Sequence, residues 1–409
     1  MANSVRPDSG KEYSNRRSFI RKGAIAAGAA TVGAGLLGNG LPAFGKEDEF
    51  GGHLNKGDAA ILRFLQALET IEADLWRQYA ELGGATNQGF SPIDLKDQNG
   101  KSVVTGLASL YVTGLQQLDG DMPQYIVDNT DDEFTHAAFL KAYLESKGAS
   151  TVDLNKNFAN LPPSKVTGVP QDGRLTNLTQ LTIDTSWWTR YRSETQNPDF
   201  GDTFDQAIPT LNVGRHTAIP RTDGDLIADN GNPSGVSNHT QAIASTAGIH
   251  FAFIEQGGSS LYPSLAQRVT SLEVLRILLS IGPTETSHFQ VWHDKAGNTL
   301  QPPLAPFSDT DKGFPGSTGA TVMFPNLNAS SDPKVADELQ TNLIMPEPTI
   351  FLNRKFPIVS IIRPTETKGA AMGAVKGLMA DGLFIGQSPE FFELLRDLAE
   401  DADEARRDL

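Results

Sequence analysis

Residues 131–140 read DDEFTHAAFL, and residues 283–292 read PTETSHFQVW. Each stretch places a histidine three positions after a glutamate. The pairs are Glu133/His136 and Glu285/His288. Residues three apart on an α-helix share a face, so each pair can direct a carboxylate and an imidazole to one point. The pattern favours a ligand set, and the alternative is an ordinary solvated or hydrogen-bonded pair in each helix.

The composition limits what such a ligand set can be. The chain has 409 residues, 39% hydrophobic and 20% charged, which is typical of a soluble globular protein. Its net charge of −15 argues against a nucleic acid or an anionic membrane as partner. The absence of cysteine excludes disulfides, thiolate zinc sites and cysteine-ligated iron–sulfur clusters. Any metal must therefore be held by oxygen and imidazole ligands.

The N-terminus has the features of an export signal. Residues 14–23 read SNRRSFIRKG, with Arg16 and Arg17 paired, and a Gly/Ala-rich apolar run follows from Gly23 to Gly38. That run is too short for a confident membrane span. Residues 1–45 resemble a twin-arginine signal peptide, and a basic tail before a buried helix is the alternative. The resemblance implies the twin-arginine translocase as a partner and a periplasmic or extracellular location.

Periodic apolar residues predict four long helices. Their expected ranges are 58–82, 121–147, 240–262 and 271–296. The ends carry matching signals, such as Pro123 in the first turn of the second helix and Thr270-x-x-Glu273 at the start of the fourth. The second and fourth helices contain the two Glu-x-x-His pairs.

The first and third helices each add a carboxylate. Glu72 falls on the apolar stripe of the first helix, between Leu68 and Leu75, which favours it over Glu69 one turn earlier. Glu255 is the one acidic residue of the third helix, and a solvated residue near that helix end is the alternative. His250 and His293 have no glutamate three positions before them, so we expect them outside the ligand set.

Charge balance then predicts a metal centre. The expected ligands are Glu72, Glu133, His136, Glu255, Glu285 and His288. A helix bundle cannot bury four carboxylates uncompensated, because each buried charge costs several kcal/mol. Two divalent cations supply the missing positive charge, and these ligand types suit iron or manganese.

Four segments carry a family resemblance. They are LETIEADLWRQY, DDEFTHAAFLKAYLESKG, HFAFIEQGGSSLY and TETSHFQVW. They resemble the core helices of the ferritin-like superfamily, nearest to its bacterial and fungal branch of desiccation- or stress-related proteins. The resemblance implies a mainly α chain, with a ferritin-like four-helix bundle over residues 55–297. The resemblance does not cover residues 149–236, which we expect to be a long crossover insertion because of their length, or residues 298–409, which we expect to be a C-terminal extension of unknown role.

The resemblance also implies a class of function. We expect an exported dinuclear metal–carboxylate protein that handles O₂ or H₂O₂ in stress protection, with oxidase-like or catalase-like activity if it is an enzyme. The alternative is a stress-associated structural or metal-sequestering protein without turnover. The sequence leaves the metal, the substrate and the oligomeric state open.

Overall fold

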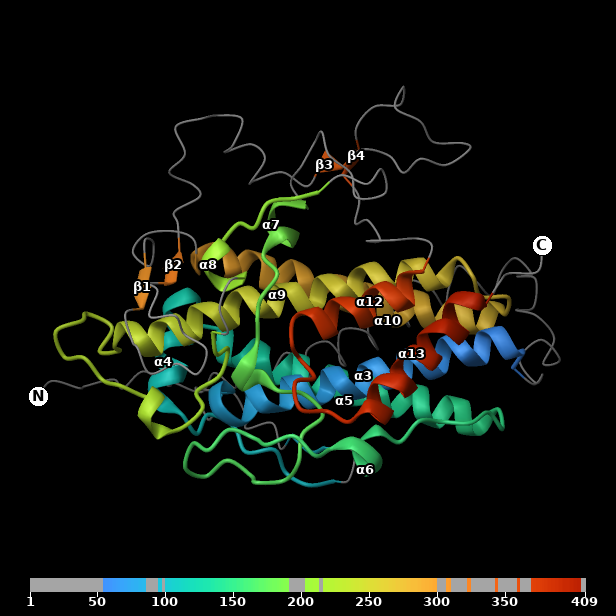
Figure 1. The fold of residues 1–409 in the computed structure, drawn as a ribbon, viewed down its shortest axis with the longest axis horizontal. Coiled ribbons are helices and arrows are strands. Elements are labelled where there is room, and N and C mark those ends of the chain that lie inside the picture. The colour runs from blue at the N-terminus through green and yellow to red at the C-terminus, as the bar shows by residue number, and fades with distance from the viewer. Residues whose placement is uncertain are drawn as a thin grey trace, which may run out of the picture. The chain divides into compact units, whose positions relative to one another are not determined.

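Four long helices dominate the described part of the chain (Figure 1). They are α3 (Lys56–Gly83), α5 (Met122–Ser146), α9 (Asn238–Ala266) and α10 (Leu272–Thr299). The computed structural model describes residues 54–85, 95–97, 100–190, 203–212, 216–299 and 369–405, together with the backbone of four short strands. The mainly α fold class is confirmed, and each of the four helices covers its predicted range to within a few residues.

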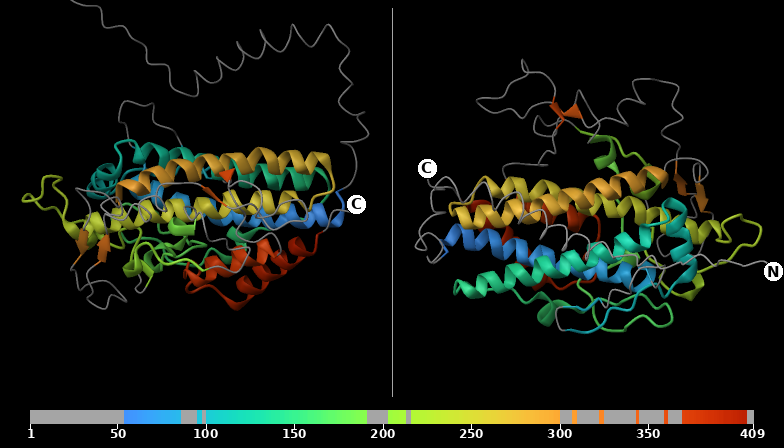
Figure 2. Two further views of the ribbon diagram at one scale, coloured as in Figure 1. Left: turned by 90° about the horizontal axis from the view of Figure 1, so that it is seen from above. Right: turned by 180° about the vertical axis from the view of Figure 1, so that it is seen from behind.

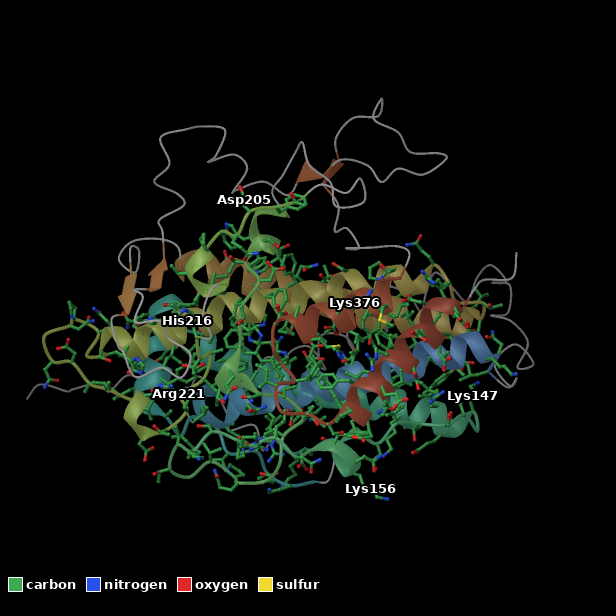
Figure 3. The ribbon with its side chains drawn as sticks, viewed as in Figure 1. Lys147, Lys156, Asp205, His216, Arg221 and Lys376 are labelled. Carbon is green, nitrogen blue, oxygen red and sulfur yellow. The ribbon has the colours of Figure 1, made fainter. Side chains whose placement is uncertain are left out.

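The helices associate as two pairs. α3 packs against α5, and α9 packs against α10. The connection from α5 to α9 is the long crossover expected from the sequence, and α4 (Ser109–Leu118) packs on α9. At the far end of the α5 helix the Lys147 ammonium lies 2.8 Å from the Glu273 carboxylate of α10 (Figure 3).

The shorter elements are as follows. The helical ones are α6 (Leu154–Phe158), η2 (Leu178–Gln180), α7 (Ser186–Arg190), α8 (Pro209–Asn212), η4 (Asp223–Asp225), α12 (Ala370–Ala380) and α13 (Pro389–Glu404). Strands β1 (Phe307–Asp309) and β2 (Val322–Phe324) pair antiparallel, as do β3 (Leu343–Ile344) and β4 (Val359–Ser360). No helix among the described residues has the length and apolarity to cross a membrane. Arg16, Arg17 and the rest of the expected signal peptide lie outside the described residues.

Polar side chains hold the starts of the first and fourth helices together. Asn55 caps α3 by accepting a hydrogen bond from the Asp58 backbone N–H. The Asp58 carboxylate accepts the backbone N–H groups of Thr270 and Ser271 at 2.8 and 2.9 Å. The Ser271 hydroxyl accepts the N–H of Glu273, so Ser271 caps this end, one residue later than the predicted Thr270.

A polar seam on α3 anchors the crossover insertion. The Asp74 carboxylate accepts hydrogen bonds from the backbone N–H groups of Leu175 and Thr176 and from the Thr176 hydroxyl. About two helical turns to either side, Gln66 bonds both backbone groups of Val152, and Glu81 binds the Arg174 guanidinium at 2.8 Å. Because Gln66, Asp74 and Glu81 recur every seven or eight residues, they lie on one face of α3.

The C-terminal helices cover the bundle on the same side as the insertion. α13 packs against α3, and α12 packs against α9. In the left view of Figure 2 the red C-terminal helices and the green insertion lie on one side of the long helices. The Ser388 hydroxyl caps α13, as its sequence predicts, by accepting the Phe391 N–H. α3 is therefore enclosed on several sides, which bears on the site below.

Candidate metal centre

Six acidic and basic side chains from the four long helices converge in the bundle interior. Glu69 comes from α3, Glu133 and His136 from α5, Glu255 from α9, and Glu285 and His288 from α10. All four carboxylates are at most 2% exposed, and the two histidines are 9% and 6% exposed. They form two groups that could each hold a metal ion. The first is Glu69, Glu133, His136 and Glu285, and the second is Glu133, Glu255, Glu285 and His288.

The first group surrounds Nδ1 of His136. This atom lies 3.4 Å from Glu69 Oε2, 3.2 Å from Glu133 Oε2 and 3.1 Å from Glu285 Oε1. The three carboxylates belong to three different helices, so the packing of α3, α5 and α10 brings the group together.

The second group surrounds Nδ1 of His288. This atom lies 3.2 Å from Glu133 Oε1, 3.3 Å from Glu255 Oε2 and 4.0 Å from Glu285 Oε2. Glu133 and Glu285 belong to both groups, and each directs one oxygen to each histidine. The two imidazole rings are 6.4 Å apart between centroids. The arrangement is two adjacent ligand groups that share two carboxylates.

The donor atoms suit bound cations. Several of them are buried and have no partner at hydrogen-bond geometry. They are Glu69 Oε2, Glu133 Oε1, Glu255 Oε2, both carboxylate oxygens of Glu285, and His288 Nδ1. A buried polar atom without a partner costs stability, and carboxylate and imidazole atoms this close are the ligands that divalent iron and manganese take. The residues present therefore fit a metal centre.

Electrostatics within the cluster point the same way. Burial raises the pKa of Glu285 well above its usual range, and repulsion by Glu133 and Glu69 raises it further. Burial likewise raises the pKa of Glu133 to about 7. Burial also pushes the pKa of Glu69 upward, but the hydrogen bond and the charge of His136 outweigh it and lower that pKa. Ionising all the carboxylates of the cluster at once is therefore unfavourable unless positive charge lies between them.

The two histidines respond in the opposite sense. Burial disfavours the charged imidazole of His136, but hydrogen bonds to Glu133 and Glu285 raise its pKa far above the usual value. The pKa of His288 is also raised well above its usual value, since the charge of Glu255 and the contact with Asp132 outweigh burial. Bound protons on the imidazoles and bound cations between the ligands are therefore alternative ways to neutralise the same carboxylates.

A surrounding layer of side chains orients the ligands. Asn129 Nδ2 donates to Glu255 Oε1 at 3.0 Å, and Tyr262 donates its hydroxyl proton to Glu69 Oε1. His288 Nε2 donates to Asp132 Oδ2 at 3.2 Å, which leaves Nδ1 of that ring directed at the carboxylates. Gly258 of α9 lets Glu285 approach, because a Cβ at this position would lie 2.9 Å from Glu285 Oε2.

The sequence did not predict these surrounding residues. Tyr262 stands seven residues after Glu255, two helical turns along one face, so helical spacing carried a signal for it. Asn129 and Asp132 had no such signal, because their partners belong to other helices, α9 and α10.

The structure brings together five of the six predicted ligands and replaces the sixth. Glu69, the alternative in the sequence analysis, joins the first group, and Glu72 belongs to neither group. The apolar stripe that favoured Glu72 faces a cavity on the outer side of the bundle. Leu68, Glu72 and Leu75 all line that cavity. α3 is covered on several sides by α5, α13 and the insertion, so its most apolar stripe does not mark the face toward the bundle axis.

Glu72 nevertheless remains close to the cluster. It is half-buried, and its buried Oε1 has no hydrogen-bond partner. Burial raises its pKa well above the usual value, and repulsion by Glu133 and Glu255 adds to the increase.

His250 and His293 lie outside the two groups, as the sequence analysis expected. His250 Nδ1 forms a 2.6 Å hydrogen bond with the Tyr79 hydroxyl, and burial lowers the pKa of His250 to about 3, so the ring is neutral there. His293 stacks on Trp188 of the insertion, with ring centroids 4.9 Å apart.

The comparison with known families agrees with this geometry. The ferritin-like domain matches residues 57–298, more than half of the 409-residue chain. The chain belongs to the ferritin-like domain family. No curated protein and no solved structure matches it. The ferritin-like domain spans α3 to α10 and so contains every residue of both ligand groups, the crossover insertion included.

Proposed function

We propose that this protein is a dinuclear metal–carboxylate oxidoreductase that acts on O₂ or H₂O₂. The observation that carries the proposal is the sharing of Glu133 and Glu285 between two adjacent ligand groups. A single-metal site needs no second histidine with its own terminal carboxylate, whereas a two-metal site needs shared carboxylates between its ions. Glu69 and His136 would complete one position, and Glu255 and His288 the other.

The protein residues have separable roles in this proposal. Two iron or manganese ions, when bound, supply the redox chemistry that reduction or dismutation of O₂ or H₂O₂ requires. Burial of all four carboxylates excludes bulk water from the ligand groups. The Tyr262 hydroxyl, held on Glu69, places a proton beside the first group, and Asn129 fixes the Glu255 carboxylate.

We further propose that the protein acts after export, in protection against desiccation or a related oxidative stress. This rests on the paired Arg16 and Arg17 before the apolar run and on the resemblance to stress-related ferritin-like proteins. The twin-arginine route carries folded proteins, which suits a chain that must assemble its ligand groups before it leaves the cytoplasm.

Metal analysis tests the centre. Protein exported with its own signal should contain two iron or manganese ions per chain, and Glu133→Gln should lower that content because Glu133 belongs to both groups. Glu145→Gln is the matched control, since Glu145 is exposed on the same helix. A peroxide-decomposition and O₂-consumption assay of the loaded protein then separates an enzyme from a metal-binding scaffold. Two bound ions without turnover on either oxidant would support the sequestering alternative.

Replacement of both Arg16 and Arg17 by Lys tests export. The signal receptor reads the paired guanidinium groups, so the double variant should stay in the cytoplasm although its charge is unchanged. Lys22→Arg, which alters a basic residue outside the pair, should leave export intact. Normal export of the double variant would exclude the twin-arginine route.

A further inference from the structure

A cavity of about 500 Å³ adjoins the metal centre on the side away from α5 and α10. α3, α9 and α12 form its walls, and Asp184 and Gln206 of the insertion lie at one end. Glu69 and Glu72 line it together with Tyr262, so the cavity reaches the ligand groups. Its volume falls within the range of sites for small organic molecules, well above what O₂ or H₂O₂ needs.

The walls are mostly apolar. The apolar side chains include Leu68 and Leu75 of α3, Phe253 and Leu261 of α9, and Leu378 of α12. No lysine, arginine or histidine occurs among the described lining residues, whereas four carboxyl groups do. The carboxyl groups are Glu69, Glu72, Asp184 and Asp381. Such a cavity favours an uncharged apolar ligand and disfavours an anion.

Small residues keep the cavity open. α12 presents Gly373, Ala374 and Gly377 to it, and α9 presents Gly257. A Cβ atom added at Gly257 or at Gly377 would meet no heavy atom within 4 Å. The space beside these two glycines is therefore large enough to receive ligand atoms.

One buried carboxyl group, that of Asp381, belongs to the lining of this space. Asp381, at the end of α12, is 8% exposed, and its buried Oδ2 has no hydrogen-bond partner among the described residues. Burial, together with repulsion by Asp184, raises the pKa of Asp381 to about 8. A neutral carboxyl can both donate and accept a hydrogen bond, which is also the capacity of a hydroxyl group.

We propose that this cavity binds an apolar organic molecule that carries a hydroxyl group, with the hydroxyl on Asp381 and the apolar body along α12 and α9 beside Glu72. The site is distinct from the ligand groups and needs no metal. It would place an organic molecule next to the centre, where a co-substrate of the proposed oxidoreductase would have to lie.

Titration with 2-naphthol tests the proposal. This fluorescent probe has an apolar bicyclic body and a phenolic hydroxyl that stays protonated at neutral pH, since phenols titrate at roughly 10. The full chain, prepared without metal, should bind it saturably and with one site. Naphthalene, which lacks the hydroxyl, should bind at least fivefold more weakly. 2-Naphthoate should not bind measurably, because no basic side chain among the described lining residues can pair with its charge, whereas four carboxyl groups line the cavity.

Variants locate the binding. Gly377→Phe should weaken 2-naphthol binding at least tenfold, since the new ring fills the space beside α12. Lys376→Phe is the matched control on the same helix, because Lys376 is exposed and does not line the cavity (Figure 3). Asp381→Ala should remove the preference for 2-naphthol over naphthalene while leaving naphthalene binding in place.

The outcomes separate this proposal from the metal chemistry. Absence of saturable binding, or equal effects of Gly377→Phe and Lys376→Phe with unchanged thermal midpoints, would overturn the cavity site. Unaltered discrimination in Asp381→Ala would overturn the assignment of the hydroxyl. Because binding is measured without metal, a failed metal or peroxide assay leaves these results standing, and failed probe binding leaves the metal centre standing.

Discussion

Nδ1 of His136 lies 3.1 Å from Oε1 of Glu285, although the two residues belong to different Glu-x-x-His motifs on different helices. The contact with Glu133, its partner in the motif, is 3.2 Å. His288 shows the same preference more strongly, at 3.2 Å from Glu133 and 4.0 Å from Glu285. Each motif therefore completes the ligand group of the other, and neither helix holds a whole site by itself.

The two ligand groups predict the loss of one metal ion when either histidine is removed. His136→Ala deletes a ligand of the first group only, so metal content should fall from two ions per chain to one. His288→Ala should have the same effect on the second group, and the double variant should lose most of both. Inductively coupled plasma mass spectrometry after gel filtration measures the stoichiometry, and far-UV circular dichroism checks the helices.

His216→Ala is the control for these variants. His216 is buried, and its Nε2 forms a hydrogen bond with the Thr210 carbonyl. It belongs to neither ligand group and is far from their residues in the sequence. Two ions per chain in the double histidine variant would contradict the dinuclear assignment.

A second prediction follows because Glu69, and not Glu72, belongs to the first ligand group. Glu69→Gln should lower metal content by about one ion per chain, because the amide replaces a carboxylate of the first group. Glu72→Gln should keep both ions and should stabilise the metal-free protein, since it removes a carboxyl group that neighbouring carboxylates repel. The reverse ranking in metal content would restore Glu72 as the ligand.

A third prediction concerns the polar seam between α3 and the insertion. The Arg174 side chain is fully buried and binds both carboxylate oxygens of Glu81. Arg174→Met removes one of the two arginines that bind this buried carboxylate and leaves Arg77, at 2.9 Å, as the other, so the loss should be on the order of 3 kcal/mol, the lower end of what breaking a buried pair costs. Urea unfolding measures the loss. The double variant Arg174→Met/Glu81→Leu should recover most of it, because an apolar pair replaces the buried charges, and failure to recover would show that the insertion needs the ion pair itself.

The sequence predicted the bundle well because its signals are local. Period-3.6 apolar residues and end signals such as Pro123 in the first turn of α5 act within one helix, so they are visible without knowledge of any other segment. The Glu-x-x-His pairs were visible for the same reason. The choice between Glu69 and Glu72 was different, because both side chains line the cavity and only the packing of α3 against the other helices decides which of them joins the ligand group.

Contacts across long separations account for the remaining gaps. Asp58 binds backbone groups of Thr270 and Ser271, and Arg174 pairs with Glu81. Nothing in the neighbourhood of Asp58 or Arg174 in the sequence indicates these partners. The cavity likewise exists only because α12 of the C-terminal extension packs on α9. Tertiary placement of distant segments decided each of these features.

The last prediction follows from the raised pKa values in the cluster. A carboxyl whose pKa is higher in the folded than in the unfolded state holds its proton longer when folded, so folding stability falls as pH rises above the unfolded value of 4.5. For Glu133, whose pKa is raised to about 7, the loss is on the order of 3 kcal/mol over that interval. The raised pKa values of His136 and His288 act in the same direction above pH 6.5, because the folded protein keeps the imidazolium protons that the unfolded chain releases there.

Metal-free protein should therefore show a urea midpoint that decreases steadily from pH 5 to pH 8, whereas metal-loaded protein should show a much smaller decrease. Bound cations hold the carboxylates ionised and the imidazoles neutral in the folded state, so those groups no longer take up protons in this range. Asp381, with its pKa raised to about 8, lies outside both ligand groups and should cause a residual decrease in the loaded protein that Asp381→Asn removes. Glu69 does not offset the trend, because its pKa is lowered and its contribution changes only below pH 4.5. Equal slopes for the metal-free and loaded proteins would show that the six clustered side chains are not the groups that metal neutralises.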